Sequence, residues 1–496
     1  MLKTLLTIGL ACVFNVIAVA ELSPYMKTTP VKCESRIDRL LAANWKKHGF
    51  PIPPEASDAV MVRRLYLDLA GRLPSPREAR AYVESEDPQK RQLLIERLLT
   101  SEEFADYWTM HWGDILRIKS EFPINLWPNA VYGYQRRILR FIRDNEPYDR
   151  FAREFLSAAG SNFRQPEANF YRATADRSPE GIARMAVLTF LGNRLEKWPT
   201  AVQREWITLF EPIHFKNTKE WKEEIVYWKG ENSGGELRNT VADKMLAHPD
   251  FPRAAVNRVW YWMFGQGIVQ EADDLRPDNP PVNPELFEEL TAEFVKSGYD
   301  FRKLCRLIAN SAAYRAAPFA GDEKAERYFA SYPVRRFDAE VLDDAIRDLT
   351  GQPSRYSSVI PEPFTFLPAE ARTITLADGS ISSSFLILFG RPARDSGVLS
   401  ERNNKATSKQ RLWLFNSGEL ARKLSRIQRR DELKKLPFRH KIVELYWFFY
   451  SRPPTVRERQ ILLQEYNQLP NGPRKWRFIQ DLCWILLNSK EFLYQH

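Results

Sequence analysis

The stretch HWGDILR contains residue types that acid–base catalysis uses. His111, Asp114 and Arg117 are spaced three apart, so on a helix they lie on neighbouring faces and an acid, a base and a cation could converge. We predict His111 and Asp114 as the catalytic pair, with Trp112 and Arg117 as binding residues. The alternative is a structural helix with a buried His–Asp hydrogen bond beside the tryptophan.

A second candidate is the stretch NRVWYWMFGQGIVQEADDLRPDNPPVNPE, residues 257–285. A tryptophan-rich helix leads through a glycine turn into a loop dense in carboxylates. Such a loop could bind a hard cation, but the EF-hand spacing is missing and an arginine stands among the acids, which favours internal ion pairs. We predict no metal here, and binding residues at Asn257, Arg258, Trp260, Asp274, Arg276, Asp278 and Asn279.

A third candidate is the arginine-rich stretch FGRPARDSGVLSERNN, residues 389–404. Paired arginines can hold a sulfate, carboxylate or phosphate group. The alternative is a loop fixed to the core by arginine–carboxylate pairs. The predicted binding residues are Arg391, Arg394, Asp395, Glu401 and Arg402.

Other chemistry has no recognisable signal. The six histidines are scattered singly, without zinc-site spacing, and the chain has neither a Gly-x-Ser-x-Gly elbow nor a phosphate-binding glycine loop. We therefore predict no cofactor and no metal. If the three candidate stretches line one cleft, an enzymatic function gains support; if their charges are paired internally, it loses support.

A repeated heptapeptide indicates how the chain positions these residues. LLTSEEF (98–104) returns as LLNSKEF (486–492), and a looser copy, LIANSAAY (307–314), lies between them. Upstream of the first and last copies stand LYLDLAGRLPSPREARAYV and LYWFFYSRPPTVRERQILL, which align without a gap through their Arg-x-Pro-[Ser/Thr]-x-Arg-Glu core. The chain therefore carries a helical unit near both ends.

The unit contains readable helix starts. Ser75 and Thr455 are followed three residues later by Glu78 and Glu458, which predicts two capping boxes. The serine of each heptapeptide predicts a further helix N-cap.

The same alignment accounts for the cysteines. Ile95, Cys305 and Cys483 each stand six residues before a motif serine, on the apolar face of a helix. One position thus holds Ile, Cys and Cys, so we expect both cysteines to be small core residues and not to form a bridge.

The remaining pattern is mainly α, with at most a short β-hairpin, expected at TITLADGSISSSFLILFG (373–390). We predict a signal peptide at 1–20, an N-terminal helical domain at 21–195, an irregular connector at 196–240 and a C-terminal helical domain at 241–496. The linker and hairpin fall within 352–390.

The N-terminus MLKTLLTIGLACVFNVIAVA has one lysine, an apolar run and a small-x-small cleavage site that ends at Ala20. A lipoprotein signal ending at Cys12 is the alternative. No later stretch is long and apolar enough to span a bilayer. We expect an exported protein, periplasmic, secreted or held at the cell surface through partners.

The composition is that of a globular protein, with 44% hydrophobic and 27% charged residues over 496 positions. The net charge of +10 comes from 73 basic and 63 acidic residues that are scattered along the chain. This favours a solvated basic surface, with a polyanion partner (acidic polysaccharide, lipid headgroup or nucleic acid) as the alternative. No nucleic-acid-binding signature is present.

Several long stretches resemble secreted planctomycete-type proteins built from two domains of unknown function, numbered 1549 and 1553, which often occur with cytochrome c modules. The first domain is matched by RRLYLDLAGRLPSPREA, LLTSEEFADYWTMHWGDILR and DNEPYDRFAREFL. The second is matched by HPDFPRAAVNRVWYWMFGQGIVQEADDLRPDNPPVNPELFEEL, RRFDAEVLDDAI, FGRPARDSG and SERNN.

The chain departs from those relatives in two respects. Relatives often have cysteines before the Glu-Arg of the arginine loop, where Val398, Leu399 and Ser400 stand here. Many carry a Cys-x-x-Cys-His haem motif shortly after FLG, whereas FLG at 190–192 is followed here by NRLEKWPTAV. The resemblance implies a role in extracytoplasmic polymer handling. We therefore expect a binding or scaffold protein that works with an extracytoplasmic protein partner or an anionic polysaccharide; the alternative is a hydrolase acting on anionic glycans.

Overall fold

The computed structural model of the protein describes residues 23–232, 234–319, 322–367, 370–427, 433, 435–470 and 472–496. The predicted signal peptide lies outside these residues. In the described part of the chain, no helix combines the length and apolar character that a bilayer span requires.

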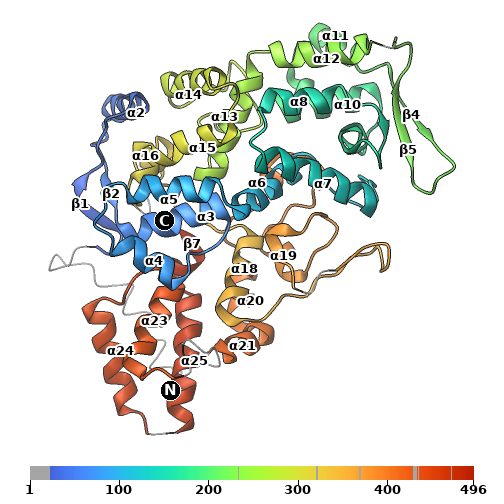
Figure 1. Ribbon diagram of the computed structural model, residues 1–496. Coiled ribbons are helices and arrows are strands. Elements are labelled where there is room, and N and C mark those ends of the chain that lie inside the picture. The colour runs from blue at the N-terminus through green and yellow to red at the C-terminus, as the bar shows by residue number, and fades with distance from the viewer. Residues whose placement is uncertain are drawn as a thin grey trace.

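The fold is mainly α, as predicted (Figure 1). The elements up to residue 191 are β1 (Met26–Pro30), α2 (Arg36–Lys47), β2 (Pro54–Ala56), α3 (Asp58–Ala70), α4 (Pro76–Val83), α5 (Lys90–Leu99), α6 (Glu102–Ile115), α7 (Pro128–Arg143), α8 (Tyr148–Leu156), β3 (Gly160–Ser161), α9 (Asn169–Arg172) and α10 (Pro179–Leu191). The connector holds α11 (Thr200–Thr208), β4 (Ile213–Asn217) and β5 (Glu224–Trp228).

The remaining elements are α12 (Glu236–Ala247), α13 (Asp250–Phe264), α14 (Pro284–Lys296), α15 (Phe301–Asn310), α16 (Ala312–Arg315), α17 (Glu323–Arg327), β6 (Arg335–Arg336), α18 (Ala339–Thr350), α19 (Ser384–Leu388), α20 (Ser408–Asn416), α21 (Gly418–Ser425), α23 (Phe438–Tyr450), α24 (Val456–Gln468), α25 (Pro473–Leu487), α26 (Lys490–Leu493) and β7 (Tyr494–Gln495). Of these elements, α14 lies beside α2, α23 to α25 form an arm at the bottom of Figure 1, and β7 returns the C-terminus to the neighbourhood of α3.

Three small antiparallel sheets join segments that are distant in sequence: β1 with β2, β3 with β5 and β4, and β6 with β7. In the last of these, Arg335 lies opposite Gln495 and Arg336 opposite Tyr494. The buried apolar side chains form one cluster that runs from Val31 to Phe492. The two halves of the chain therefore share a core, and the predicted domain boundaries stay predictions.

The first repeated unit is fixed by its own capping box and one arginine. Ser75 caps α4 and accepts from the backbone N–H of Glu78, whose carboxylate accepts from the N–H of Ser75. Arg72 pairs with Glu78 at 2.9 Å and with Glu103 of the heptapeptide at 3.5 Å. Gly71 ends α3 in the left-handed region, at φ 59°.

The last unit repeats this arrangement. Thr455 and Glu458 form the capping box of α24, and Arg452 pairs with Glu458 at 2.8 Å and with Glu491 at 2.6 Å. Ser451 takes the place of the glycine, at φ 59°. The heptapeptide's acid is therefore the partner of the unit's arginine, and its serine is a helix cap.

Helix α3 binds the middle and last copies of the heptapeptide through two arginines. Arg63 donates to the carbonyls of Phe449 and Phe492 at 2.7 and 2.9 Å, and Arg64 donates to the carbonyl of Tyr314. Both arginines are buried, and burial lowers the pKa of Arg63 to about 10. Tyr314 and Phe492 belong to the short helices α16 and α26 that follow a motif serine, and Phe449 lies near the C-terminal end of α23, so these guanidiniums satisfy carbonyls that helix ends leave unpaired.

The cysteine prediction is confirmed. Ile95, Cys305 and Cys483 are all fully buried in the core, and both thiols are free. Burial raises the pKa of both thiols well above the ordinary range, so they remain protonated.

Two expectations about irregular segments were wrong. Residues 373–390 do not form a hairpin but a 3₁₀ turn at Thr373–Thr375 followed by α19. The carboxylate of Asp344 accepts the backbone N–H groups of Thr373 and Ile374, and the side chain of Ser383 caps α19, so these amides have partners without a second strand. Conversely, the connector expected to be irregular contains the β4–β5 hairpin.

Candidate functional site

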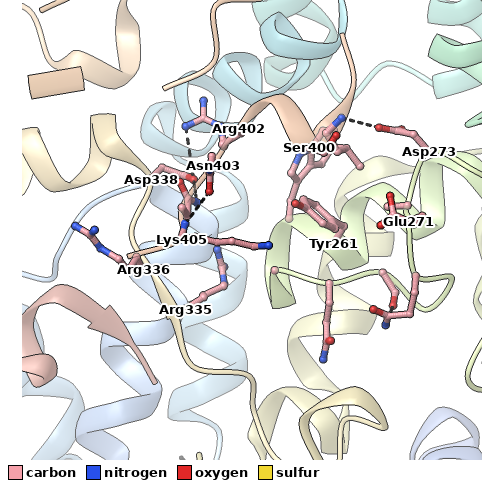
Figure 2. A pocket seen from close by; sticks show the side chains of 18 of the residues that line it. Tyr261, Glu271, Asp273, Arg335, Arg336, Asp338, Ser400, Arg402, Asn403 and Lys405 are labelled. Carbon is pink, nitrogen blue, oxygen red and sulfur yellow. Dashed lines mark hydrogen bonds and ion pairs between the residues drawn. The ribbon is translucent and has the colours of Figure 1, made fainter. Parts of the chain in front are cut away.

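A cavity of about 680 Å³ lies where α6, the end of α13 and the 399–406 loop meet (Figure 2). Strand β6 and the start of α18 form another part of its wall, and the β6–β7 pairing places Tyr494 there as well. The cavity therefore draws on segments from both ends of the chain. Its charged, histidine and tyrosine lining residues are His111, Arg194, Tyr261, Glu271, Asp273, Arg335, Arg336, Asp338, Arg402, Lys405 and Tyr494.

His111 lies in the wall of this cavity and is only 3% exposed. Its ring stacks on Trp262 with centroids 5.2 Å apart. Within the described residues neither ring nitrogen has a hydrogen-bond partner. Burial lowers the pKa of His111 to about 4, so the imidazole is neutral near pH 7. It therefore has one free donor and one free acceptor.

The carboxylate that faces His111 is Asp338, at 3.6 Å from Nε2. Asp338 accepts from the hydroxyl of Tyr107 at 3.1 Å and from the amide of Asn404 at 2.7 Å. Burial alone would raise the pKa of Asp338, but the nearby charge of Arg402 outweighs it and holds the pKa down, at about 2. Asp338 is thus ionised and fixed in place.

Asp114 belongs to an ion-pair network behind this wall. It accepts from Arg394 at 2.8 Å and from Arg402 at 2.7 Å. Arg402 also pairs with Glu340 at 2.7 Å, and Glu340 pairs with Arg391 at 3.1 Å. The fold therefore does not bring His111 and Asp114 together as the predicted hydrogen-bonded pair, because arginines bind both carboxylate oxygens of Asp114.

The tryptophan-rich helix and its loop are joined internally. Asp273 accepts from Arg258 at 3.1 Å and from the backbone N–H of Leu399 at 2.6 Å. Asn257 donates to the carbonyl of Val269 at 3.2 Å and accepts from its N–H at 3.0 Å. Asp273 lines the cavity, whereas Asn257 and Arg258 are not among its lining residues and shape the loop.

The rest of the acidic loop pairs with cations and backbone groups. Asp274 contacts Lys197 at 2.6 Å and Arg276 at 2.7 Å, and Arg276 contacts Asp278 at 3.0 Å. Asn279 donates to the carbonyl of Asp274 at 2.9 Å. In the described part of the chain, no group of three or more His, Cys, Asp or Glu residues could hold a metal ion.

Two predicted arginines adopt backbone conformations that are uncommon for residues with a side chain. Arg117 has φ 56° and Arg394 has φ 61°. Arg117 is buried and donates to the carbonyl of Ser396 at 3.0 Å, and burial lowers its pKa to about 10. Arg394 donates to the carbonyl of Ala377 at 2.7 Å. Both hold the 395–398 turn against α6.

The other predicted binding residues also have structural contacts. Asp395 pairs with Lys119 at 2.6 Å, and Glu401 accepts the backbone N–H of Asp395 at 2.9 Å. Trp112 and Trp260 are fully buried in the core. Neither tryptophan offers a free ring face to a ligand.

Two cavity cations that the sequence did not single out, Arg194 and Lys405, are available to a ligand, whereas the guanidinium of Arg336 lies 4.9 Å from the ring centre of Phe389 and points away from the opening (Figure 2). In the part of the chain that the structure describes, no carboxylate lies within ion-pair distance of Arg194, Arg336 or Lys405. Arg336 donates to the neutral side chain of Gln410, and the buried Nε of Arg194 has no acceptor. Lys405 reaches across the opening toward Tyr261 (Figure 2). A sequence signal for part of the cavity wall was the motif RRFDAE, which contains the lining residues Arg336 and Asp338.

Comparison with known protein families identifies both halves of the chain. Residues 36–194 match the model of PSCyt2, a protein of unknown function (DUF1549), and residues 236–466 match that of PSD1, a protein of unknown function (DUF1553). Among curated proteins and among solved structures the comparison finds no match. The two matches occur in the expected order and cover most of the chain, so the protein belongs to the two-domain family in which PSCyt2 and PSD1 modules are joined.

Proposed function

We propose that the protein is an extracytoplasmic binding component of a system that processes anionic polysaccharide, and that the cavity holds an acidic sugar unit. The observation that carries this proposal is the pair of cations that line the cavity without carboxylate partners, Arg194 and Lys405. Export is supported by the apolar N-terminus with its cleavage site at Ala20.

The size and lining of the cavity suit such a ligand. Its volume of about 680 Å³ lies within the range of small-molecule sites. Gln266, Gln270 and Asn403 add side-chain amides to the wall, which can donate to and accept from sugar hydroxyls. Guanidinium groups such as that of Arg194 match the planar oxygen pairs of carboxylate and sulfate.

Titration calorimetry with a sulfated tetrasaccharide and its unsulfated counterpart would test the proposal. We expect the sulfated sugar to bind at least tenfold more tightly, with an affinity that falls as salt is added. Lys405→Gln and Arg194→Gln should each weaken binding about tenfold, equivalent to about 1.4 kcal/mol. Lys409→Gln is the matched control, since Lys409 is exposed nearby on α20 but does not line the cavity. Equal affinity for both sugars would reject the proposal.

A second candidate function, hydrolysis of the bound glycan, rests on the neutral His111 beside the ionised Asp338. A neutral imidazole can accept a proton from water, and a carboxylate on its other side stabilises the cation that results. In this arrangement Asp338 replaces Asp114 as the partner of the histidine, and Asp114 supports Arg402.

Release of new reducing ends from the same sulfated oligosaccharide would reveal hydrolysis. His111→Gln should abolish release but change binding less than threefold, because glutamine keeps a donor and an acceptor. If wild-type protein binds the sugar and releases no ends over a prolonged incubation, the function is binding alone.

A further inference from the structure

An exposed apolar patch lies at the tips of three loops, far from the cavity residues in sequence. The loops are the α6–α7 connection, the β4–β5 turn at the right of Figure 1, and the segment before residue 367. Val359 is 85% exposed, Phe122 79% and Phe366 65%. We call this group the loop-tip patch: the exposed Phe122, Trp221, Val359, Phe364 and Phe366, with the half-buried Trp127.

Ring contacts hold the three loops together. Trp127 meets Trp221 at a centroid distance of 4.7 Å and Phe364 at 5.8 Å, and Trp221 meets Phe364 at 5.4 Å. The ammonium of Lys222 lies 5.0 Å from the ring centre of Trp127 and 5.9 Å from that of Trp221. One aromatic cluster thus takes a residue from each loop.

Polar contacts fix the more exposed side chains next to this cluster. Glu121 accepts the backbone N–H of Val359 at 2.9 Å, which places Phe122 and Val359 on adjoining loops. The hydroxyl of Tyr132 on α7 donates to the carbonyl of Phe366 at 3.3 Å. The patch is therefore one surface assembled from distant segments.

The backbone at the patch is held in costly conformations. Trp127 has φ 74° and Lys222 has φ 62°, in a region that bulky side chains rarely adopt. Such strain persists only where the surroundings enforce it, and it gathers at functional surfaces.

The hairpin tip adds positive charge around the exposed tryptophan. Residues 216–222 carry three lysines and one glutamate. The neighbouring Glu223 is half-buried and accepts from the hydroxyls of Ser161 at 2.5 Å and Thr218 at 2.8 Å. The lysines, all exposed, are Lys216, Lys219 and Lys222.

These features fit a lipid surface better than a sugar chain. A sugar stacks on a free ring face, but Trp127 is already approached by Trp221 and by the ammonium of Lys222. Val359 offers no ring at all. Protruding phenylalanine, tryptophan and valine side chains, with lysines beside them, are what shallow insertion among anionic headgroups requires.

We propose that the loop-tip patch docks the protein on an anionic lipid bilayer, with Phe122, Trp221, Val359 and Phe366 inserted at the headgroup boundary and the hairpin lysines over lipid phosphates. The docking is independent of what the cavity binds. Trp221 and the lysines come from the connector, which lies between the two regions that the family models match.

Sedimentation with vesicles of equal parts phosphatidylcholine and phosphatidylglycerol tests the proposal, using the chain from residue 21 onward. We expect the wild-type protein to bind these vesicles, and vesicles of phosphatidylcholine alone at least tenfold more weakly. Phe122→Ser with Trp221→Ser should reduce binding to the mixed vesicles at least tenfold. Lys219→Gln should reduce it about fivefold.

A matched pair of surface changes provides the control. Leu412 and Leu93 are 61% and 57% exposed on α20 and α5, which are not among the three loops of the patch, so Leu412→Ser with Leu93→Ser should leave vesicle binding unchanged. Equal circular dichroism spectra and melting temperatures for both double variants would show that each is folded. The proposal is overturned if the wild type does not bind the mixed vesicles, or if the two double variants lose vesicle binding equally. It is also overturned if the patch double variant loses binding to dextran sulfate, a soluble polyanion, but keeps its binding to the vesicles.

Discussion

Removal of Arg402 should destabilise the protein far more than removal of an exposed arginine. Three guanidiniums and three carboxylates form a neutral network beside the cavity: Arg391, Arg394, Arg402, Asp114, Asp338 and Glu340. Arg402 donates to Asp114 at 3.0 and 2.7 Å and to Glu340 at 2.7 and 3.1 Å. Arg402→Met removes these charge-assisted bonds and leaves one unbalanced negative charge among buried groups.

The expected cost is about 3–5 kcal/mol in the free energy of unfolding, the range found when one partner of a buried ion pair is removed. Arg306→Met is the comparison, because Arg306 forms a bidentate pair with Glu96 in which both side chains are substantially exposed. An exposed pair contributes about 0–1 kcal/mol. Urea denaturation of the two variants and the wild type, followed by circular dichroism, measures both costs.

A second substitution checks the cause. Glu340→Gln added to Arg402→Met removes the excess negative charge, so the double variant should recover about 1–2 kcal/mol relative to Arg402→Met alone. The reasoning fails if Arg402→Met costs no more than Arg306→Met, or if the added Glu340→Gln lowers stability further.

Three further outcomes follow from the geometry. Burial lowers the pKa of His111 from 6.5 to about 4, so the unfolded chain takes up that proton first and the free energy of unfolding falls as pH drops through this window. The stability advantage of the wild type over His111→Asn should therefore shrink by about 3 kcal/mol between pH 7 and pH 4. Parallel plots of unfolding free energy against pH for the two proteins would contradict this. Ser451→Gly should stabilise the protein by about 0.5–1 kcal/mol, since it relieves a left-handed φ and removes a buried unpaired hydroxyl. Gly71→Ser should destabilise it by about 2 kcal/mol or more, because a Cβ there would lie 2.4 Å from a tyrosine ring. The melting temperatures of the two variants test both predictions. Arg452→Ala should cost about 2–3 kcal/mol and Arg72→Ala about 1 kcal/mol, because the former is more buried and holds both of its carboxylates closely; equal costs in urea denaturation would refute this ranking.

Local signals in the sequence predicted much of the helical architecture. The capping boxes at Ser75 and Thr455 depend on residues three apart, and the structure contains both. The position shared by Ile95, Cys305 and Cys483 followed from aligning three short motifs, and all three side chains are buried. These features are set by neighbours along the chain, which a single sequence displays directly.

The candidate site was harder to predict because its partners are distant in sequence. Spacing placed Asp114 near His111, but the oxygens of Asp114 are bound by arginines nearly three hundred residues away. Asp338, which does face His111, lies just before α18. The same limit explains the missing hairpin, where the carboxylate of Asp344 binds the amides that a partner strand would otherwise use.

The arginines of α3 also constrain the order in which the molecule can assemble. Arg63 lies in an early helix, yet the carbonyls that accept its protons belong to Phe449 and Phe492. During translation, the segment around α3 emerges from the ribosome long before those carbonyls are made. The guanidinium of Arg63 then has no native acceptors. The N-terminal half therefore cannot finish its own core during translation, and we expect it to remain loosely packed until the last repeat has been made. A chain cut before residue 486 would keep the recognisable sequence of its first family module and still fail to close the core around it.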